Sequence, residues 1–392
     1  MEHLITPSQL PRNAQSTSCQ KFTPRTVIAI WNAAGLIDAA TVSGSQASAA
    51  GISVRVDAAR GGCEAVLCVV LTMRQTFLLL LFITLPISVV LWFINAFVSS
   101  TIGGSVIEPS RWLSATLLPV IVAWWGLRKK SLSSSGAVCG LIVGFLLTLG
   151  SYVFFVNLLI FFVSSSKATK YKSAMKRKLE SDHKEGGERN WVQVMCNGGV
   201  ASLIAWFYIV DCGCGENPVD LIYSYRCSWL SVAVLGALAC CNGDTWASEF
   251  GAVLSFGDPL LITNLQSVPR GTNGGVSLIG LLVSFLGGLL VGLGHYLTLL
   301  MLVSTPVMIA APPQWPIVLV GAAGGLLGSL IDSLLGATMQ YSGITSEGKI
   351  VERPGENVKH ISGSHILDNH AVNLISSLLT AIFLPRVALL IM

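Results

Sequence analysis

Residues 228–251 read Ser-Trp-Leu-Ser-Val-Ala-Val-Leu-Gly-Ala-Leu-Ala-Cys-Cys-Asn-Gly-Asp-Thr-Trp-Ala-Ser-Glu-Phe-Gly. The apolar run from Ser228 to Cys241 ends in a polar segment that carries two carboxylates, Asp244 and Glu249. Charged groups in or beside a membrane span are costly, so they usually face a polar cavity. We therefore expect this stretch to place a functional site at the membrane surface, with the other helices holding it in position.

A second polar stretch follows and contributes to the same predicted site. Residues 268–277 read Val-Pro-Arg-Gly-Thr-Asn-Gly-Gly-Val-Ser. The backbone N–H groups of its glycine-rich part are unhindered and can cradle phosphate oxygens. Those residues are Gly271, Thr272, Asn273, Gly274 and Gly275. Three cations, Arg270, Lys129 and Lys130, can neutralise phosphate charge.

The composition is that of a multi-spanning membrane protein. Of 392 residues, 52% are hydrophobic and 11% are charged, and the mean hydropathy is +0.68. Soluble domains carry about 25% charged residues. The net charge of +4 is modest and its basic residues cluster near span ends, which fits membrane topology better than nucleic-acid binding. We predict an all-α polytopic helix bundle in the lipid bilayer of an internal membrane such as the endoplasmic reticulum, with no nucleic-acid partner.

The N-terminal part of the chain differs from the rest. Residues 1–72 are rich in Ser, Thr and Ala and hold no apolar run long enough to cross a membrane. We expect them to form a disordered extension. Residues 73–392 form the predicted membrane domain, because Met73-Arg74 is followed directly by an apolar run typical of a signal-anchor helix.

The apolar runs predict about eight spans. They cover about residues 77–98, 112–127, 137–163, 192–210, 228–241, 276–303, 315–339 and 371–390. The basic residues before and after the third run both favour the cytosolic side. At 1.5 Å per residue that run reaches about 40 Å, which allows one tilted crossing but not two full ones. A broken or re-entrant pair hinged near Gly150-Ser151 reconciles the two observations.

Small residues recur every four positions in two spans. One series is Ser284, Gly288 and Gly292, and the other is Gly324, Gly328 and Asp332. Small residues at this spacing let helix backbones approach closely. Helix packing explains the glycines but not Asp332, which is therefore a further candidate for a functional role.

The polar residues at span ends form a set suited to magnesium and phosphate. They are Lys129, Lys130, Asn242, Asp244, Ser248, Glu249, Arg270, Thr272, Asn273, Asp332, Asp368, Asn369 and Asn373. Carboxylate and amide oxygens are ligands that Mg²⁺ prefers, and Mg²⁺ also keeps water and phosphate oxygens. Phosphoryl transfer needs mainly such positioning and electrostatics. For Asp244 alone, a structural role is an alternative to metal binding, namely an acidic residue in the first turn after a helix N-cap. Asp244 and Glu249 can reach one ligand only if a helix starts between them.

The cysteines and histidines yield weaker predictions. Cys212, Cys214 and Cys227 lie in one polar loop, where a disulfide to Cys227 can form if the loop faces an oxidising lumen. A fourth metal ligand is missing nearby in the sequence. Three histidines at a spacing of five do not share a helix or strand face; they are His360, His365 and His370. Residues 343–350 nearly match a P-loop but end in Ile where Ser or Thr must bind Mg²⁺, so we reject that motif.

Several of these stretches resemble a known group of membrane proteins. The likeness rests on residues 127–132, 184–193, 242–251, 269–277, 332–340 and 367–373. They are similar to the transmembrane protein 19 family of animals from about Met73 to the C-terminus. The wider family includes bacterial and archaeal membrane proteins and the plant chloroplast phytyl-phosphate kinase, which makes a prenyl diphosphate using a nucleoside triphosphate.

The core of the motif also resembles CTP-dependent phytol and dolichol kinases. The matching residues are Gly243, Asp244, Ala247, Ser248 and Gly251. Those kinases have Lys-Ser-x-Glu-Gly after this core, whereas residues 269–275 here read Pro-Arg-Gly-Thr-Asn-Gly-Gly. The resemblance therefore implies that Arg270 and the glycine N–H groups take over phosphate binding.

Two functional hypotheses follow. The first is a kinase that uses Mg²⁺ and a CTP- or UTP-like nucleoside triphosphate to phosphorylate a prenyl or polyprenyl (mono)phosphate. In this hypothesis, the metal is held by Asp244, Asp332 and Glu249. The phosphate is bound by Arg270 and residues 271–275. The head group is positioned by Asn369 and Asn373, and the glycine-lined spans hold the lipid tail. The second is a transporter or a non-catalytic multi-pass membrane protein, since broken helices and polar groups also suit transport. A site at one side of the membrane favours the kinase, and polar groups at mid-depth favour the transporter.

Overall fold

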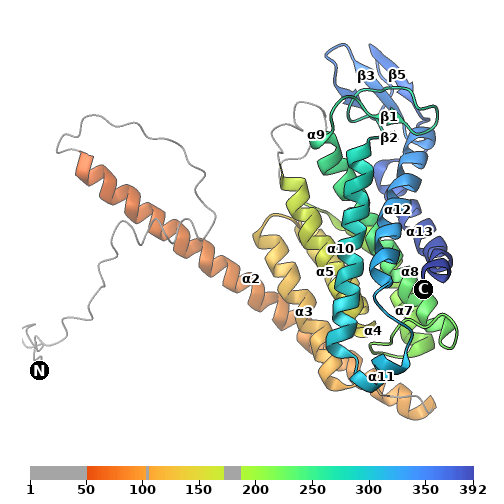
Figure 1. The fold of residues 1–392 in the computed structure, drawn as a ribbon. Coiled ribbons are helices and arrows are strands. Elements are labelled where there is room, and N and C mark those ends of the chain that lie inside the picture. The colour runs from red at the N-terminus through yellow and green to blue at the C-terminus, as the bar shows by residue number, and fades with distance from the viewer. Residues whose placement is uncertain (1–50, 103–105, 172–186) are drawn as a thin grey trace, which may run out of the picture. The chain divides into compact units, whose positions relative to one another are not determined.

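The computed structural model describes residues 51–102, 106–171 and 187–392, with side chains from Gln75 onward. By its contacts the chain divides into two units, Met1–Leu67 and Cys68–Met392, and every candidate span lies in the second. The long helices are α2 (Gly51–Ile102), α3 (Pro109–Arg128), α4 (Ser134–Gly150), α5 (Tyr152–Lys170), α7 (Trp191–Cys212), α8 (Tyr225–Trp246), α10 (Leu278–Leu302), α12 (Ile317–Met339) and α13 (Asn369–Ile391). The predicted helical membrane bundle is confirmed (Figure 1).

Short elements connect the helices. A π-helical turn, η1 (Ala247–Gly251), continues α8 and is followed by α9 (Ala252–Leu254), and α11 (Thr305–Ala310) precedes α12. Two small antiparallel sheets were not predicted. They contain β1 (Leu260–Leu261) with β2 (Gly275–Val276), and β4 (Ile350–Val351), β3 (Ser342–Thr345) and β5 (Val358–Ser362) in the order β4-β3-β5. Figure 1 shows both sheets at one end of the helices.

Part of the predicted N-terminal extension is described by the structure. Residues 51–72 are helical there and belong to α2. Residues 1–50 lie outside the described part of the chain, so the prediction for them stays a prediction.

Seven helices in the described ranges are long and apolar enough to cross a membrane. They are Gln75–Thr101, Tyr152–Lys170, Trp191–Cys212, Tyr225–Gly251, Leu278–Leu302, Ile317–Met339 and Asn369–Ile391. The predicted span at residues 112–127 is a helix, α3, but it is not among the seven. The predicted run 137–163 is not one span, because α4 and α5 divide it.

The break between α4 and α5 falls at the predicted hinge. Ser151 has an extended backbone, its N–H donates to Leu147 O, and its hydroxyl accepts from the N–H of Val153 to cap α5. Polar residues at both outer ends extend the helices beyond the apolar run, to 17 and 19 residues. Each helix is therefore about 25 to 28 Å long. The length estimated from the apolar run alone, which allowed only one crossing, was too short because it left out these polar ends.

The two basic clusters lie at the same end, as the charge pattern predicted. The Nζ atom of Lys170, at the end of α5, donates to Lys129 O and to Ser131 Oγ, between α3 and α4. Leu132 and Arg189 pair as an isolated β-bridge, which joins the start of α7 to the same place. The α4–α5 pair is thus a helical hairpin that goes away from this end and returns to it.

Helix α8 is the centre of the bundle. It packs against α5, α7, α10, α12 and α13, and its residues from Ser231 to Gly243 are buried on all sides. Small side chains permit this crowding. A Cβ added at Gly243, for example, would lie 2.7 Å from the backbone of Gly325 in α12.

The glycine stripes bring α10 and α12 into backbone contact. A Cβ added at Gly288 would lie 2.3 Å from Gly321 O, and one at Gly325 would lie 2.4 Å from Ser284 O. The predicted close packing is confirmed. The same contacts leave no room for a lipid tail between α10 and α12. The hypothesis that the glycine-lined spans hold the tail stays a prediction.

Candidate functional site

Polar residues from both predicted stretches gather near one end of the bundle. The C-terminal halves of α5, α8 and α12 meet the N-terminal halves of α7, α10 and α13 there. The second stretch lies against the end of the first, because a Cβ added at Gly251 would lie 3.7 Å from Ser277 Oγ. It is also bonded to the segment just after the first stretch, where Ser255 Oγ donates to Ser277 Oγ over 2.7 Å and Arg270 Nη2 donates to Ser255 O over 3.0 Å. Asp332 lies seven residues from the end of α12, which is about 10 Å. Asp244 lies ten residues from the end of α9, which is about 15 Å along the continuous helical segment.

Asn242 joins three helices and has a structural role. Its side chain is fully buried. Its Oδ1 accepts from Ser164 Oγ (2.7 Å) and Ser165 Oγ (3.0 Å) of α5, and its Nδ2 donates to Gly287 O (2.8 Å) of α10. A buried amide with all these bonds made has little left for a ligand.

The N-cap alternative for Asp244 is wrong. Helix α8 does not start at Asn242 but runs through it to Trp246 and continues as the π-helical turn that contains Glu249. No helix starts between Asp244 and Glu249, so the condition for both to reach one ligand through such a start is not met. Single π turns inside helices are frequent at functional sites.

Asp244 and Asp332 form the electrostatic centre of the site. They come from α8 and α12, are half-buried, and lie close enough for their charges to interact. Asp332 Oδ2 accepts from Ser376 Oγ over 3.0 Å. Within the described ranges, no Lys or Arg forms an ion pair with either carboxylate.

Asn373 connects this centre to the start of α13. With its amide nitrogen turned toward acceptors, it donates to Asp332 Oδ2 (3.2 Å) and to Asn369 O (3.3 Å). Asn369 is exposed at the first position of α13. Asp368 is the N-cap of that helix, with its Oδ1 accepting from Ala371 N over 2.8 Å. The predicted head-group residues thus lie next to Asp332.

Some of the backbone N–H groups of the glycine-rich stretch already make hydrogen bonds within the protein. Three of its five N–H groups donate within the protein: Thr272 N to Pro269 O, Asn273 N to Ser342 Oγ and Gly275 N to Thr272 O. Gly274 has a φ of +79°, and a Cβ there would lie 2.6 Å from Ser333 O, beside Asp332 on α12. The stretch therefore packs directly against the helix that carries the second carboxylate.

Lys129 and Lys130 belong to a different part of the same end. Both are exposed after α3, and the charge of Lys129 interacts with that of Lys170, as does the charge of Arg189. The structure places the predicted phosphate cations in two groups, one around Arg270 and one at the junction of α3, α4, α5 and α7.

A three-residue metal centre is not visible. Within the described residues, no group of three or more His, Cys, Asp and Glu side chains has a metal-binding arrangement. Magnesium commonly uses one or two carboxylates together with water and substrate phosphates. The pair Asp244 and Asp332 fits that pattern, and Glu249 lies on the adjoining π-helical turn.

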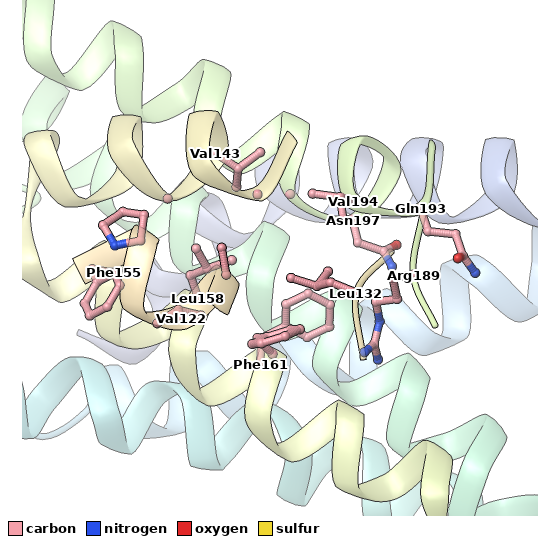
Figure 2. Close-up of a pocket in the computed structure, with 16 residues that line it drawn as sticks. Val122, Leu132, Val143, Phe155, Leu158, Phe161, Arg189, Gln193, Val194 and Asn197 are labelled. Atoms are coloured by element: carbon pink, nitrogen blue, oxygen red, sulfur yellow. The ribbon is translucent and has the colours of Figure 1, made fainter. Parts of the chain in front are cut away.

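A narrow apolar pocket of about 60 Å³ adjoins the site, and the sequence did not predict it. It lies between α3, α4, α5 and α7, and three of its lining residues are polar: Arg189, Gln193 and Asn197 (Figure 2). The sequence signalled only the start of α7 beside the pocket, because Asn190 and Gln193 have the spacing of a capping box. Both bonds of that box form, from Gln193 N to Asn190 Oδ1 and from Asn190 N to Gln193 Oε1.

Comparison with known proteins identifies the family. Residues 117–381 match the family model described as Integral membrane protein DUF92. The chain belongs to this family. The DUF92 match covers all the candidate site residues, from Lys129 to Asn373. The multi-pass membrane character predicted from composition is that of the family.

Individual relatives of this DUF92 member come from plants, archaea and cyanobacteria. Protein PGR of Arabidopsis thaliana is 42% identical over 279 residues, which cover 71% of this chain and 96% of that protein. The uncharacterized membrane protein MJ0933 of Methanocaldococcus jannaschii is 27% identical over 235 residues, covering 60% and 85%. The uncharacterized membrane protein sll0875 of Synechocystis is 31% identical over 182 residues, covering 45% and 66%. No solved structure matches the chain.

Proposed function

We propose that this protein is a kinase that transfers a phosphoryl group from a nucleoside triphosphate to a prenyl or polyprenyl monophosphate, in an internal membrane such as the endoplasmic reticulum. The observation that carries the proposal is the carboxylate pair Asp244 and Asp332. It lies near one end of the bundle and has no cationic partner in the described chain. Two adjacent carboxylates repel each other, and a divalent cation removes that repulsion.

The chemistry of the surrounding groups supports magnesium. Both carboxylates are hard oxygen ligands, and Ser376 and Asn373 orient Asp332 by donating hydrogen bonds to it. Bound Mg²⁺ would neutralise charge on the phosphate oxygens. The residues of this chain hold the carboxylates in place, which is the positioning that phosphoryl transfer requires.

Arg270 has capacity left for phosphate. Its Nη2 donates to Ser255 O and Gly257 O, which ties down the loop after α9. A guanidinium has five N–H donors, so its other donors can bind a phosphate oxygen. The N–H groups of Gly271 and Gly274 are the members of the glycine stretch that fit this role best, because the other three already donate within the protein.

The position of the pair argues against the alternative. A transporter is expected to hold its substrate at mid-depth. Asp332 lies about 10 Å from the end of its helix and Asp244 about 15 Å from the end of α9, and both ends are at the side of the loop of Arg270. This one-sided arrangement supports an enzyme that takes its nucleotide from water and its lipid from the membrane, as the resemblance to prenyl-phosphate and polyprenol kinases also implies.

The proposal is tested by radiolabel transfer. Membranes containing the full chain receive labelled CTP, UTP or ATP together with phytyl, farnesyl or geranylgeranyl monophosphate. We expect transfer to one prenyl diphosphate with one preferred nucleotide, and a loss of more than 100-fold in Asp244→Asn and Asp332→Asn. Asp211→Asn is the matched control, because Asp211 pairs with Arg226 in an exposed salt bridge outside the site. No transfer by folded wild-type protein, or full activity in Asp244→Asn, would overturn the proposal.

A further inference from the structure

The pocket between α3, α4, α5 and α7 has an apolar body and a polar end. Apolar side chains from all four helices form its body, among them Val122, Val143, Leu158 and Phe161. Figure 2 shows Arg189, Gln193 and Asn197 gathered on one side of these apolar groups. A volume of about 60 Å³ has room for roughly one isoprene unit, so the pocket suits the head end of a single branched chain rather than the two chains of a phospholipid.

Arg189 supplies a fixed positive charge at the polar end. Its backbone is held by two hydrogen bonds, from Arg189 N to Ser131 O (3.1 Å) and from Ser133 N to Arg189 O (3.0 Å). Its Nη1 donates to Ser166 Oγ over 2.8 Å. Burial lowers the pKa of Arg189 to about 10, so the side chain stays charged at neutral pH.

This charge has no carboxylate partner on the described part of the chain. The ion pairs found there do not include Arg189, and the charges nearest to Lys170 are those of Lys129 and Arg189 itself. Three cations thus gather at the junction beside an apolar pocket. Arg189 is half-buried, so its charge is partly removed from water without a carboxylate to compensate, and an anionic head group is the ligand that would offset the cost.

The polar end of the pocket adjoins the carboxylate pair. The two amide atoms of Asn373 lie 3.3 Å from Asn197 Oδ1 and 3.2 Å from Asp332 Oδ2. The Sγ atom of Cys241, three residues before Asp244, donates to Asn197 O over 3.3 Å. A head group at Arg189 and Gln193 is therefore separated from Asp332 by the side chains of Asn197 and Asn373 alone along this path.

We propose that this pocket binds the isoprene unit next to the phosphate of a prenyl monophosphate and that Arg189, with Gln193, binds the phosphate itself. The inference rests on the proposed kinase function, for which it names the lipid site. It replaces the interface of α10 and α12, where glycine contacts leave no room for a chain.

The pocket can be filled by one substitution that the structure accommodates. Gly140 lines the pocket, and a Cβ added there meets no atom within 4 Å. Gly140→Leu therefore places a side chain in the space proposed for the lipid. Val138→Phe is the matched control, since Val138 is on the same helix but 59% exposed on its outer side.

The test is photocrosslinking of the full chain by a diazirine analogue of farnesyl monophosphate, with the modified peptides located by mass spectrometry. We expect crosslinks on α4, α5 and α7, reduced at least tenfold in Gly140→Leu and unchanged in Val138→Phe. Farnesyl monophosphate should compete at least tenfold better than farnesol, and Arg189→Gln should remove that preference while Arg189→Lys retains part of it. Inorganic phosphate and phosphatidic acid serve as further competitors and should be weak.

The binding readout separates this inference from the kinase proposal. Asp244→Asn should lose transfer and keep the crosslinks, because it leaves the pocket intact. Crosslinks in the pocket without any transfer would uphold the lipid site and reject the kinase. Transfer that persists in folded Gly140→Leu and Arg189→Gln, or crosslinks that map to α10 and α12, would reject the pocket and leave the kinase standing. Thermal unfolding of each variant establishes that it is folded.

Discussion

The carboxylates at the two ends of the bundle have opposite surroundings. Away from the site, Glu216 accepts two bonds from Arg111, at 2.8 and 3.1 Å, and a third from Tyr152 N at 2.9 Å. Near the site, the charges of Asp244 and Asp332 interact, and the described chain supplies no cation to either. The first carboxylate is neutralised within the protein, whereas the other two have no such partner among the described residues.

The difference separates stability from function. A buried ion pair with its bonds satisfied serves the fold, while an unpaired group at a site lowers stability and persists only where function uses it. The end that contains Glu216 is also closed by the disulfide Cys212–Cys227. The predicted disulfide to Cys227 is confirmed, with Cys212 as the partner and Cys214 as a free thiol.

The largest loss of stability is expected from breaking the ion pair between Arg111 and Glu216. Arg111→Gln leaves Glu216 buried with a charge and no cation, and the side chains of the pair are only 14% and 11% exposed. Removing one partner of a buried pair costs about 3 to 5 kcal/mol of folding free energy. Thermal or denaturant unfolding in detergent measures it. The double variant with Glu216→Gln should recover part of the loss, and a double variant no more stable than the single one would contradict the account.

The disulfide should contribute slightly less. It closes a loop with a sequence separation of 15 residues, for which chain entropy predicts about 3 kcal/mol. Cys227→Ser should lower the free energy of unfolding by that amount and shift the mobility of the non-reduced protein on gels. Cys214→Ser is the control and should change neither property. Equal destabilisation by both substitutions would show that packing, not the crosslink, is responsible.

Magnesium should stabilise the end of the bundle that carries Asp244 and Asp332. Binding to the folded state alone adds about 2.7 kcal/mol at a metal concentration of 100 times Kd. We expect a rise in Tm with Mg²⁺ for wild-type protein and for Asp211→Asn, and none for Asp332→Asn. In the absence of metal, Asp332→Asn should be at least as stable as the wild type, because it removes repulsion with Asp244. A Tm rise that persists in Asp332→Asn would place the cation elsewhere.

The smallest effect is a change in the reactivity of Cys214, which lies beside the ion pair of Arg111 and Glu216. Burial raises the pKa of its thiol, and the negative charge of Glu216 adds to this while Arg111 opposes it. A raised pKa leaves little thiolate at neutral pH, and the thiolate fraction grows about tenfold per pH unit below the pKa. Alkylation of Cys214 by N-ethylmaleimide, followed by peptide mass spectrometry, should therefore rise about tenfold from pH 7 to pH 8. Rapid, pH-independent labelling would show that this end is more open than the structure indicates.

Local patterns in the sequence predicted much of the fold. Hydropathy located most spans, because each span must be apolar and must form its own backbone hydrogen bonds along its whole length in the membrane. The hinge at Ser151 was predicted because basic residues on both sides of one apolar run required the chain to return. The four-residue spacing of Gly288 and Gly292 predicted backbone contact between helices, since spacing on one helix face is a property of the local chain.

The sequence by itself thus determined a helical membrane protein whose polar residues gather near span ends. Only the tertiary structure decided which of them meet. Asp244 and Asp332 are 88 positions apart, and their charges interact because α8 and α12 pack closely through glycine. The pocket beside Arg189 exists because four helices leave space between them, and no single helix carries a signal for that space. Hydropathy and spacing are properties of one segment, whereas a site or a cavity is a property of how several segments pack together.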